Sequence, residues 1–208
     1  ILQCKGLTYT SFHEAISFPR DLLSERVTGY KATGTLVSLF TQLKRKDATC
    51  GGDAPLVRAN QERVVKVAEM QHVMQLLHNS VMHETGTSDE FKKKNWELGD
   101  KLAILFGDFF LALAFNQASD IQNSTVLSTF AKGIESYVTC NFEDIPQPVS
   151  TEWWEDYTQH QCSWFPSAFE CSLLVAGVKC PNELAAARTC GTNLVLEMQV
   201  CTEKYHIP

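Results

Sequence analysis

Apolar residues recur at three- and four-residue steps along most of the chain, which is the spacing of helices with one buried face. The clearest such segment runs from Ala59 to about Met82 and contains no proline or glycine. A second segment, Trp96 to Ala118, is apolar on nearly all sides, so we expect it to lie in the centre of a helical bundle. Further helices are predicted at 34–43, at 126–138, at 151–178 with an interruption at Pro166, and at 183–203 with Asn182 as N-cap.

The stretches between these segments have the composition of loops. They are Asp47–Pro55 around Gly51-Gly52, the polar stretch Glu84–Lys94, and Asn141–Val149. No stretch alternates as a strand would, and no internal repeat is present. The pattern therefore predicts a single all-α domain over residues 1–208.

Charge and cysteine spacing exclude several classes of protein. The chain has 24 acidic and 18 basic residues and a net charge of −6, which disfavours nucleic acid as a partner. The longest apolar stretch, Leu102 to Phe115, is too short to span a bilayer, so no transmembrane segment is expected. Eight cysteines occur without a Cys-x-x-Cys pair, which excludes a zinc ribbon and favours reduced thiols in an intracellular protein. Because the chain opens at Ile1 and not at methionine, we expect a processed chain or part of a longer one.

Asp108 is the first residue that suggests chemistry. It stands between Leu102–Gly107 and Phe109–Ala112, where an unpartnered carboxylate would cost several kcal/mol. Two interpretations are open: a buried acid satisfied by another helix, or a metal or substrate ligand. Periodicity alone favours the first, with Lys101 or a residue of the 59–82 helix as partner.

The residues around Asp108 resemble a known family. The run from Gly99 to Ala114 resembles the segment of trans-isoprenyl diphosphate synthases in which G-x-K-x-A-I-L-x-G-D-[FY]-L-L-A-x-A recurs. The preceding Glu69-Met70-x-His72 and Leu76-Leu77-His78 resemble that family's approach to its first aspartate-rich motif. The later matching positions, in order, are Trp153, Phe165, Ala176-Gly177, Gly191, Leu194 and Gln199-Val200. The resemblance covers residues 31–204, leaves 1–30 as an N-terminal extension, and implies an isoprenoid-synthase-type helical bundle that is truncated at its C-terminus.

The resemblance also implies a chemistry that this sequence lacks the residues to perform. In the family, two aspartate-rich motifs hold magnesium ions that bind an allylic diphosphate, and basic residues hold the second substrate. At the first motif this chain has Asn79-Ser80-Val81-Met82-His83, with no carboxylate. At the second, Thr202-Glu203 retains at most one. The retained family positions are Gly107, Asp108, Phe109 and Gln199.

We therefore expect no catalytic residues and no cofactor, the family's magnesium site being lost. A replacement metal site from His78, His83 and Glu84 is disfavoured, because the two histidines are five residues apart and one helix presents them poorly to a single ion.

Within the family, this pattern most resembles the non-catalytic subunits of the heteromeric solanesyl/decaprenyl diphosphate synthases of mitochondria. The resemblance implies an inactive subunit on the matrix side that supports synthesis of the ubiquinone side chain through an active partner subunit. Family dimers pair through the helices around the Gly-Asp-Phe block, so candidate contact residues are Phe109, Phe110, Leu113 and Phe115. For each of them, an internal core position is the alternative.

Two other functions remain open from the sequence. One is a synthase-like scaffold built into a larger mitochondrial assembly, such as a respiratory-chain complex, which the extra cysteines and short C-terminus favour. The other is an active prenyltransferase whose metal ligands are Asp100, Asp108 and Glu203.

Overall fold

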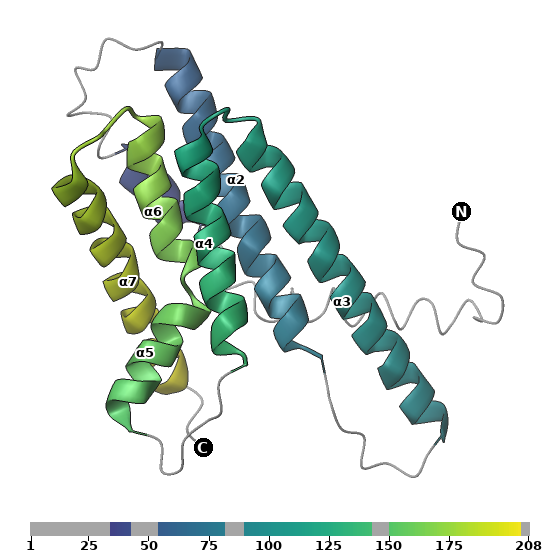
Figure 1. The fold of residues 1–208 in the computed structure, drawn as a ribbon. Coiled ribbons are helices and arrows are strands. Elements are labelled where there is room, and N and C mark those ends of the chain that lie inside the picture. The colour runs from purple at the N-terminus through teal and green to yellow at the C-terminus, as the bar shows by residue number, and fades with distance from the viewer. Residues whose placement is uncertain (1–33, 43–53, 82–89, 143–149, 205–208) are drawn as a thin grey trace. The chain divides into compact units, whose positions relative to one another are not determined.

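The computed structural model describes residues 34–42, 54–81, 90–142 and 150–204 (Figure 1). Within these ranges the regular structure is helical and contains no strand, which confirms the all-α class. A helix at 34–42 is followed by α2 (Ala54–Asn79), α3 (Glu90–Ser119), α4 (Ser124–Cys140), α5 (Thr151–Gln161), α6 (Trp164–Val175) and α7 (Pro181–Lys204).

The helices are grouped into two compact units. The first comprises Ile1–Ala32 and Met70–Leu113, and the second comprises Thr33–Glu69 and Ala114–Pro208. The boundaries fall inside α2 and inside α3, so each of these helices contributes to both units. The first unit contains the C-terminal turns of α2 and most of α3, and the second contains the remaining helices.

Two helices begin at least five residues earlier than the sequence predicts. α2 begins at Ala54 and takes in Pro55, which we expected to lie in a loop. Proline is tolerated in the first helical turn, where its missing N–H would have no intrahelical partner. α3 begins at Glu90, inside the stretch predicted to be a polar linker. Because charged residues such as Glu and Lys are good helix formers, polarity alone does not end a helix.

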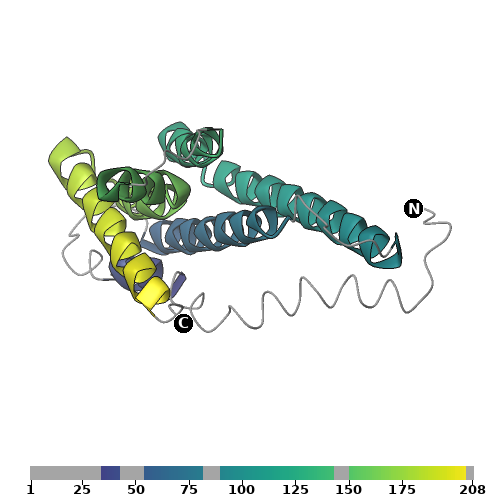
Figure 2. The ribbon, with the colours of Figure 1, turned by 90° about the horizontal axis from the view of Figure 1, so that it is seen from below.

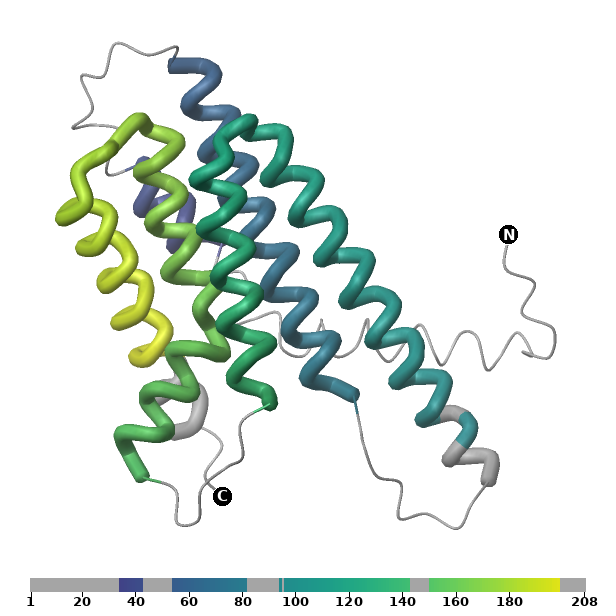
Figure 3. Tube along the Cα trace, viewed as in Figure 1, coloured from purple at the N-terminus to yellow at the C-terminus, as the bar shows by residue number. Residues whose placement is uncertain are grey.

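The predicted 151–178 helix is interrupted at Cys162-Ser163 and not at Pro166. The N–H groups of Cys162 and Ser163 bond back to Thr158 and His160, which closes α5. Pro166 then lies in the first turn of α6, where proline is again tolerated. The chain changes direction at this junction (Figure 3).

Helix α7 begins two residues earlier than predicted. Pro181 is its first residue, and the N–H of Leu184 bonds to the carbonyl of Cys180 at 3.1 Å. Asn182 is therefore inside the first turn, and its prediction as N-cap is wrong. A proline at the first helical position needs no hydrogen-bond partner and has φ already fixed near the helical value.

Helix α6 is the most thoroughly buried helix of the second unit. Its residues Trp164–Phe169 and Cys171–Leu173 are all buried, and it packs between α4 and α7, as Figures 1 and 2 show. A glycine on each neighbour, Gly133 of α4 and Gly191 of α7, allows α6 to approach both helices closely. A Cβ at Gly191 of α7 would lie 2.8 Å from the Cα of Pro166, and the Ser163 hydroxyl donates to the Gly133 carbonyl of α4 at 2.6 Å.

Aromatic stacking and an ion pair complete the packing around α6. The Phe169 ring lies 5.0 Å from that of Phe165 and 4.5 Å from that of Phe40, which fixes the 34–42 helix against α6. Arg188 of α7 donates to Glu170 at 3.1 Å. The second unit therefore has a continuous apolar core with its charges at the rim.

The five cysteines whose side chains the structure describes are free thiols. Cys140, Cys162 and Cys171 are buried, whereas Cys180 and Cys190 are exposed. Burial raises the pKa of the Cys171 thiol well above its usual value, which disfavours the reactive thiolate.

The prediction that the 96–118 helix is buried in the centre is wrong. Four of its large apolar side chains are at least two-fifths exposed, namely Ile104, Leu105, Phe106 and Phe109. A helix that is apolar all round needs apolar contacts on several sides. In the second unit, α6 is the helix with apolar contacts on several sides, whereas α3 keeps an exposed apolar face. None of the helices in the described parts of the chain has the length and apolar character needed to cross a membrane.

Candidate functional site

The candidate site lies in the first unit, where the end of α2 meets the middle of α3. Asn79 is the last residue of α2 and is exposed, and Ser80 follows in a turn. The Ser80 hydroxyl donates to the Leu77 carbonyl at 2.7 Å, so it closes the helix end. His83, the last residue of the predicted degenerate motif, lies outside the described residues. The described part of this motif therefore presents an amide and a hydroxyl.

The Gly-Asp-Phe block on α3 has one buried residue followed by two exposed ones. Gly107 is buried, whereas the side chain of Asp108 is 63% exposed and Phe109 is 54% exposed. Successive residues point about 100° apart around a helix, so a buried residue can precede two exposed ones. The predicted burial of Asp108 is wrong.

Gly107 of α3 and His78 of α2 are in close contact within this unit. A Cβ at position 107 would overlap the Nε2 and Cδ2 atoms of the His78 imidazole. The absence of a side chain at Gly107 therefore makes room for the ring.

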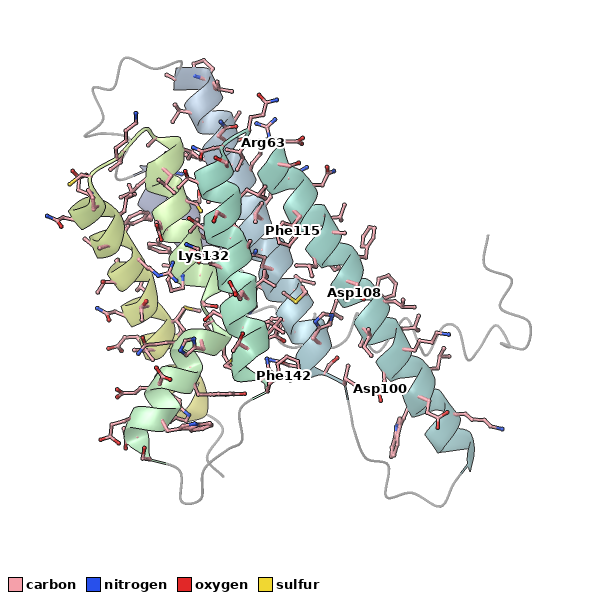
Figure 4. The ribbon with its side chains drawn as sticks, viewed as in Figure 1. Arg63, Asp100, Asp108, Phe115, Lys132 and Phe142 are labelled. Carbon is pink, nitrogen blue, oxygen red and sulfur yellow. The ribbon has the colours of Figure 1, made fainter. Side chains whose placement is uncertain are left out.

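The ring of His78 also reaches the carboxylate of Asp108. Its Nε2 lies 3.5 Å from the Asp108 Oδ1, an ion-pair distance when the imidazole is protonated. Figure 4 labels Asp108 where α3 passes the C-terminal turns of α2. A partner on the 59–82 helix was one of the two expected from the sequence, and His78 is that partner. Because the carboxylate is mostly exposed, the contact contributes at most about 1 kcal/mol.

Three polar side chains, Gln71, His72 and Gln75, lie one to two turns before His78 on α2. Gln71 and Gln75 are buried, and Oε1 of Gln71 has no hydrogen-bond partner among the described residues. Burial lowers the pKa of His72 from 6.5 to about 4, so this imidazole is neutral at physiological pH. Gln71, Gln75 and His72 are therefore neutral polar groups on α2 at physiological pH.

The remaining candidate ligands do not converge within the described residues. Asp100 and Asp108 are eight residues apart on α3, about 12 Å along its axis, which is too far for one ion. Gln199, Thr202 and Glu203 are in the last turns of α7, and their side chains lie outside the description. In the described ranges, no group of three or more His, Cys, Asp or Glu side chains is placed to hold a metal ion.

The other matched positions have structural roles in the second unit. Phe165 belongs to the α6 core, and Gly191 provides the close approach of α7 to Pro166. Gly177 has φ +85° in the turn after α6, a conformation that glycine adopts without strain. Trp153 of α5 stacks on Tyr157 at 4.9 Å.

The pairing of His78 with Asp108 was missed as a specific contact. From the sequence, His78 was considered as part of the family's approach to its first motif and as a possible metal ligand, but not as the specific partner of Asp108. The available signal was the pair of small and charged residues at Gly107-Asp108, since a buried glycine on an apolar helix often accommodates a bulky group from a neighbouring helix.

Comparisons with known proteins agree with this architecture. The chain is 27% identical over 200 residues to the all-trans-polyprenyl-diphosphate synthase PDSS2 of Mus musculus, covering 88% of this chain and 47% of that protein. It is 34% identical over 83 residues to solanesyl-diphosphate synthase 1, mitochondrial, of Oryza sativa subsp. japonica, covering 40% and 19%. Its fold matches the apo form of an Arabidopsis medium/long-chain prenyl pyrophosphate synthase with a TM-score of 0.66 and 21% identity, covering 94% of this chain and 61% of that one.

The chain is related to the trans-polyprenyl diphosphate synthases. Its fold is the isoprenoid-synthase-type helical fold, as the resemblance of the Gly-Asp-Phe block implies. No protein-family model matches it. Its alignments span less than half the length of these two curated relatives.

Proposed function

We propose that the chain is a non-catalytic polyprenyl diphosphate synthase-like subunit. In this proposal it supports synthesis of the ubiquinone side chain on the matrix side of mitochondria by associating with an active synthase subunit. The observation that carries the proposal is the end of α2, where Asn79 and Ser80 occupy positions at which the family has aspartates.

The chemistry of diphosphate departure gives this observation its weight. Magnesium prefers anionic oxygen ligands in an octahedral arrangement, and it bridges and neutralises the leaving diphosphate. Ser80 uses its hydroxyl to donate to Leu77, and Asp108 faces the imidazole of His78. A single exposed carboxylate beside an imidazole is a poor magnesium site, so this end of α2 supports a role without catalysis.

The uncovered face of α3 supports a role in association. Large apolar side chains gathered on one helix face are typical of a surface that another protein covers. Phe109 is exposed, whereas Phe110, Leu113 and Phe115 are half-buried. Of these four contact candidates, Phe109 is therefore the one most available to a partner.

The location of the relatives supports the compartment. The rice relative is named as mitochondrial, and the mouse relative is named as a polyprenyl diphosphate synthase. We therefore propose the mitochondrion as the compartment of this chain and polyprenyl diphosphate synthesis as the reaction that it supports.

A reconstituted prenyl-transfer assay tests the proposal. The chain alone, an active synthase from the same organism alone, and the two together would receive labelled isopentenyl diphosphate, an allylic primer and magnesium. We expect no product from the chain alone and more long-chain product from the mixture than from the synthase alone. Product from the isolated chain would contradict the non-catalytic role.

Affinity purification of the tagged chain from its own cells gives a second test. An aspartate-rich synthase should be the main protein recovered. Recovery of an unrelated mitochondrial assembly without a synthase would favour the scaffold function instead.

A further inference from the structure

A serine, a histidine and an aspartate lie together where α4 meets α5 in the second unit. Oγ of Ser136 lies 2.7 Å from Nδ1 of His160, and Nε2 of His160 lies 3.7 Å from Oδ1 of Asp156. Asp156 and His160 are one turn apart on α5, whereas Ser136 belongs to α4. A hydroxyl in hydrogen-bond contact with a base that a third group orients is the arrangement that activates serine as a nucleophile.

Hydrogen bonds on both sides of Ser136 fix α5 against α4 at this place. Before Ser136 in the sequence, the carbonyl of Gly133 accepts from the Ser163 hydroxyl at 2.6 Å. After it, Oδ1 of Asn141 accepts from Nε2 of Gln161 at 2.8 Å. The contact between serine and histidine is therefore positioned by the packing of the two helices, and a preorganised pair loses little entropy when it reacts.

The carboxylate of Asp156 favours one tautomer of His160. With the proton on Nε2, the N–H of the imidazole faces the negative charge of Asp156. Nδ1 is then an acceptor, and the hydroxyl of Ser136 donates to it. In this tautomer His160 can take the hydroxyl proton as the oxygen attacks a substrate.

A cation lies on the same face of α4 as Ser136. Lys132, labelled in Figure 4, is exposed and one turn before Ser136, so the Cβ atoms of the two residues are about 5–6 Å apart. Its ammonium group can approach an oxygen on which negative charge develops during attack by Ser136. Backbone N–H groups in the middle of a helix are already bonded to carbonyls, so Lys132 supplies the stabilisation that free N–H groups give in many acyl-transfer sites.

We propose that Ser136 is a nucleophile that accepts an acyl group from activated esters, with His160 as its general base. The bond between Oγ of Ser136 and the carbonyl carbon forms, and the hydroxyl proton passes to Nδ1 of His160. The bond from the carbonyl carbon to the leaving oxygen then breaks. The leaving group departs with the electron pair of that bond and receives the proton from His160, and Ser136 is left as an ester.

The exposure of the three side chains determines the class of substrate. The side chains of His160 and Asp156 are 47% and 69% exposed, and Ser136 is half-buried. Because water screens charges at such a site, amides and alkyl esters, which have poor leaving groups, should not react. Esters of phenols need less stabilisation and are the expected substrates. We expected no catalytic residues for prenyl transfer, and acyl transfer at Ser136 does not depend on whether α2 binds magnesium.

Treatment of the full chain with p-nitrophenyl acetate tests the proposal. Peptide mass spectrometry should locate an acetyl ester on Ser136 of the folded chain. In concentrated urea, acetylation of Ser136 should be at least about tenfold slower, because His160 is no longer held beside it. Acetyl groups on lysines or cysteines of the folded chain without one on Ser136 would overturn the proposal.

His160→Gln tests the general base, because glutamine is similar in size and takes up no proton. It should slow the acetylation of Ser136 at least about tenfold. Ser128→Ala is the matched control, since Ser128 is an exposed serine on the same helix, and it should leave the rate at Ser136 unchanged. Equal rates in the wild-type chain and His160→Gln would overturn the role of His160. If His160→Gln fails to fold, the comparison of folded and denatured wild-type chain still decides the proposal.

Asp156 is a positioning residue, because it acts through His160. ¹⁵N NMR of chain labelled at its histidines distinguishes protonated from unprotonated ring nitrogens. In the neutral imidazole of His160, Nδ1 should be unprotonated, and Asp156→Asn should increase the share of the other tautomer and slow the acetylation of Ser136. A protonated Nδ1 in the neutral wild-type imidazole would overturn the mechanism, and the prenyl-transfer assay with an active synthase decides the proposed function separately.

Discussion

The imidazole of His78 lies against the backbone of Gly107, in space that a side chain at position 107 would fill. This contact brings α2 and α3 together in the first unit at the position where the family's metal chemistry would begin. It also directs Nε2 of His78 toward Asp108. The retained Gly-Asp pair thus holds a histidine in place.

Gly107→Ala should lower the free energy of unfolding by about 1–2 kcal/mol, because the added methyl group must displace the ring of His78. Gly99→Ala on the same helix is the control, since a Cβ at that position would meet nothing within 4 Å. Gly99→Ala should be neutral or stabilising by up to about 1 kcal/mol, because alanine favours a helix. Urea denaturation of both variants checks the difference, and equal effects would contradict the contact.

Asp108→Asn should change stability by less than about 1 kcal/mol, because the carboxylate is largely exposed and its pairing with His78 is screened by water. This expectation replaces the larger loss that a buried ion pair would give. Thermal unfolding at neutral pH is the measurement. A loss above about 3 kcal/mol would mean that Asp108 is buried in solution.

His72 should make the chain less stable in acid. Burial lowers its pKa from 6.5 to about 4, so between these values the unfolded chain binds a proton that the folded chain does not. The free energy of unfolding should therefore fall as the pH decreases from 6.5 to 4, by up to about 3 kcal/mol. His72→Gln should reduce this slope relative to wild type. Urea titrations at several pH values would show whether the two slopes differ.

Gly191→Ala should destabilise the second unit by about 1–3 kcal/mol, because a Cβ would lie 2.8 Å from the Cα of Pro166 and backbone must move. Gly133→Ala should cost less, since its nearest neighbour is the Ser167 hydroxyl at 3.0 Å, which can rotate. Comparing the denaturation midpoints of the two variants tests the packing of α6 against both neighbours. The reverse order would indicate that α7 approaches α6 less closely.

Sequence periodicity was sufficient to predict the helices but not where they begin and end. The apolar residues of α2 and α3 predicted both helices, yet α2 begins at Ala54 and α3 at Glu90. The first turn of α2 contains Pro55, which suggested a loop, and the first turns of α3 are rich in charged residues, so neither start shows the apolar spacing that identifies the rest of the helix. Pro166 marked an interruption only approximately, because proline fits a first turn as well as it ends a helix.

Burial was predicted less well than secondary structure. The apolar composition of α3 indicated a central helix, but Leu105 and Phe109 are exposed, whereas α6, with two serines and one cysteine, is buried. Composition shows that a helix needs apolar contacts, and it does not show whether its own chain or another supplies them. The prediction that Asp108 is buried was wrong for the same reason, because it assumed that α3 is a central helix.

At the candidate site, the sequence identified the positions and the structure supplied one contact. The missing carboxylates at Asn79 and Ser80 are read directly from the sequence. The partner of Asp108 depends on how two helices pack, and residues 30 positions apart cannot be paired by spacing alone. The loss of the magnesium site remains a prediction.

Calorimetric titration of the isolated chain with a non-hydrolysable farnesyl diphosphate analogue, with and without magnesium, tests the central claim most directly. An active synthase titrated under the same conditions provides the positive control. We predict no magnesium-dependent binding by the chain, because Asn79 and Ser80 supply no anionic oxygen at the first motif. Micromolar binding that requires magnesium would contradict the non-catalytic role and would point to metal ligands elsewhere in the chain.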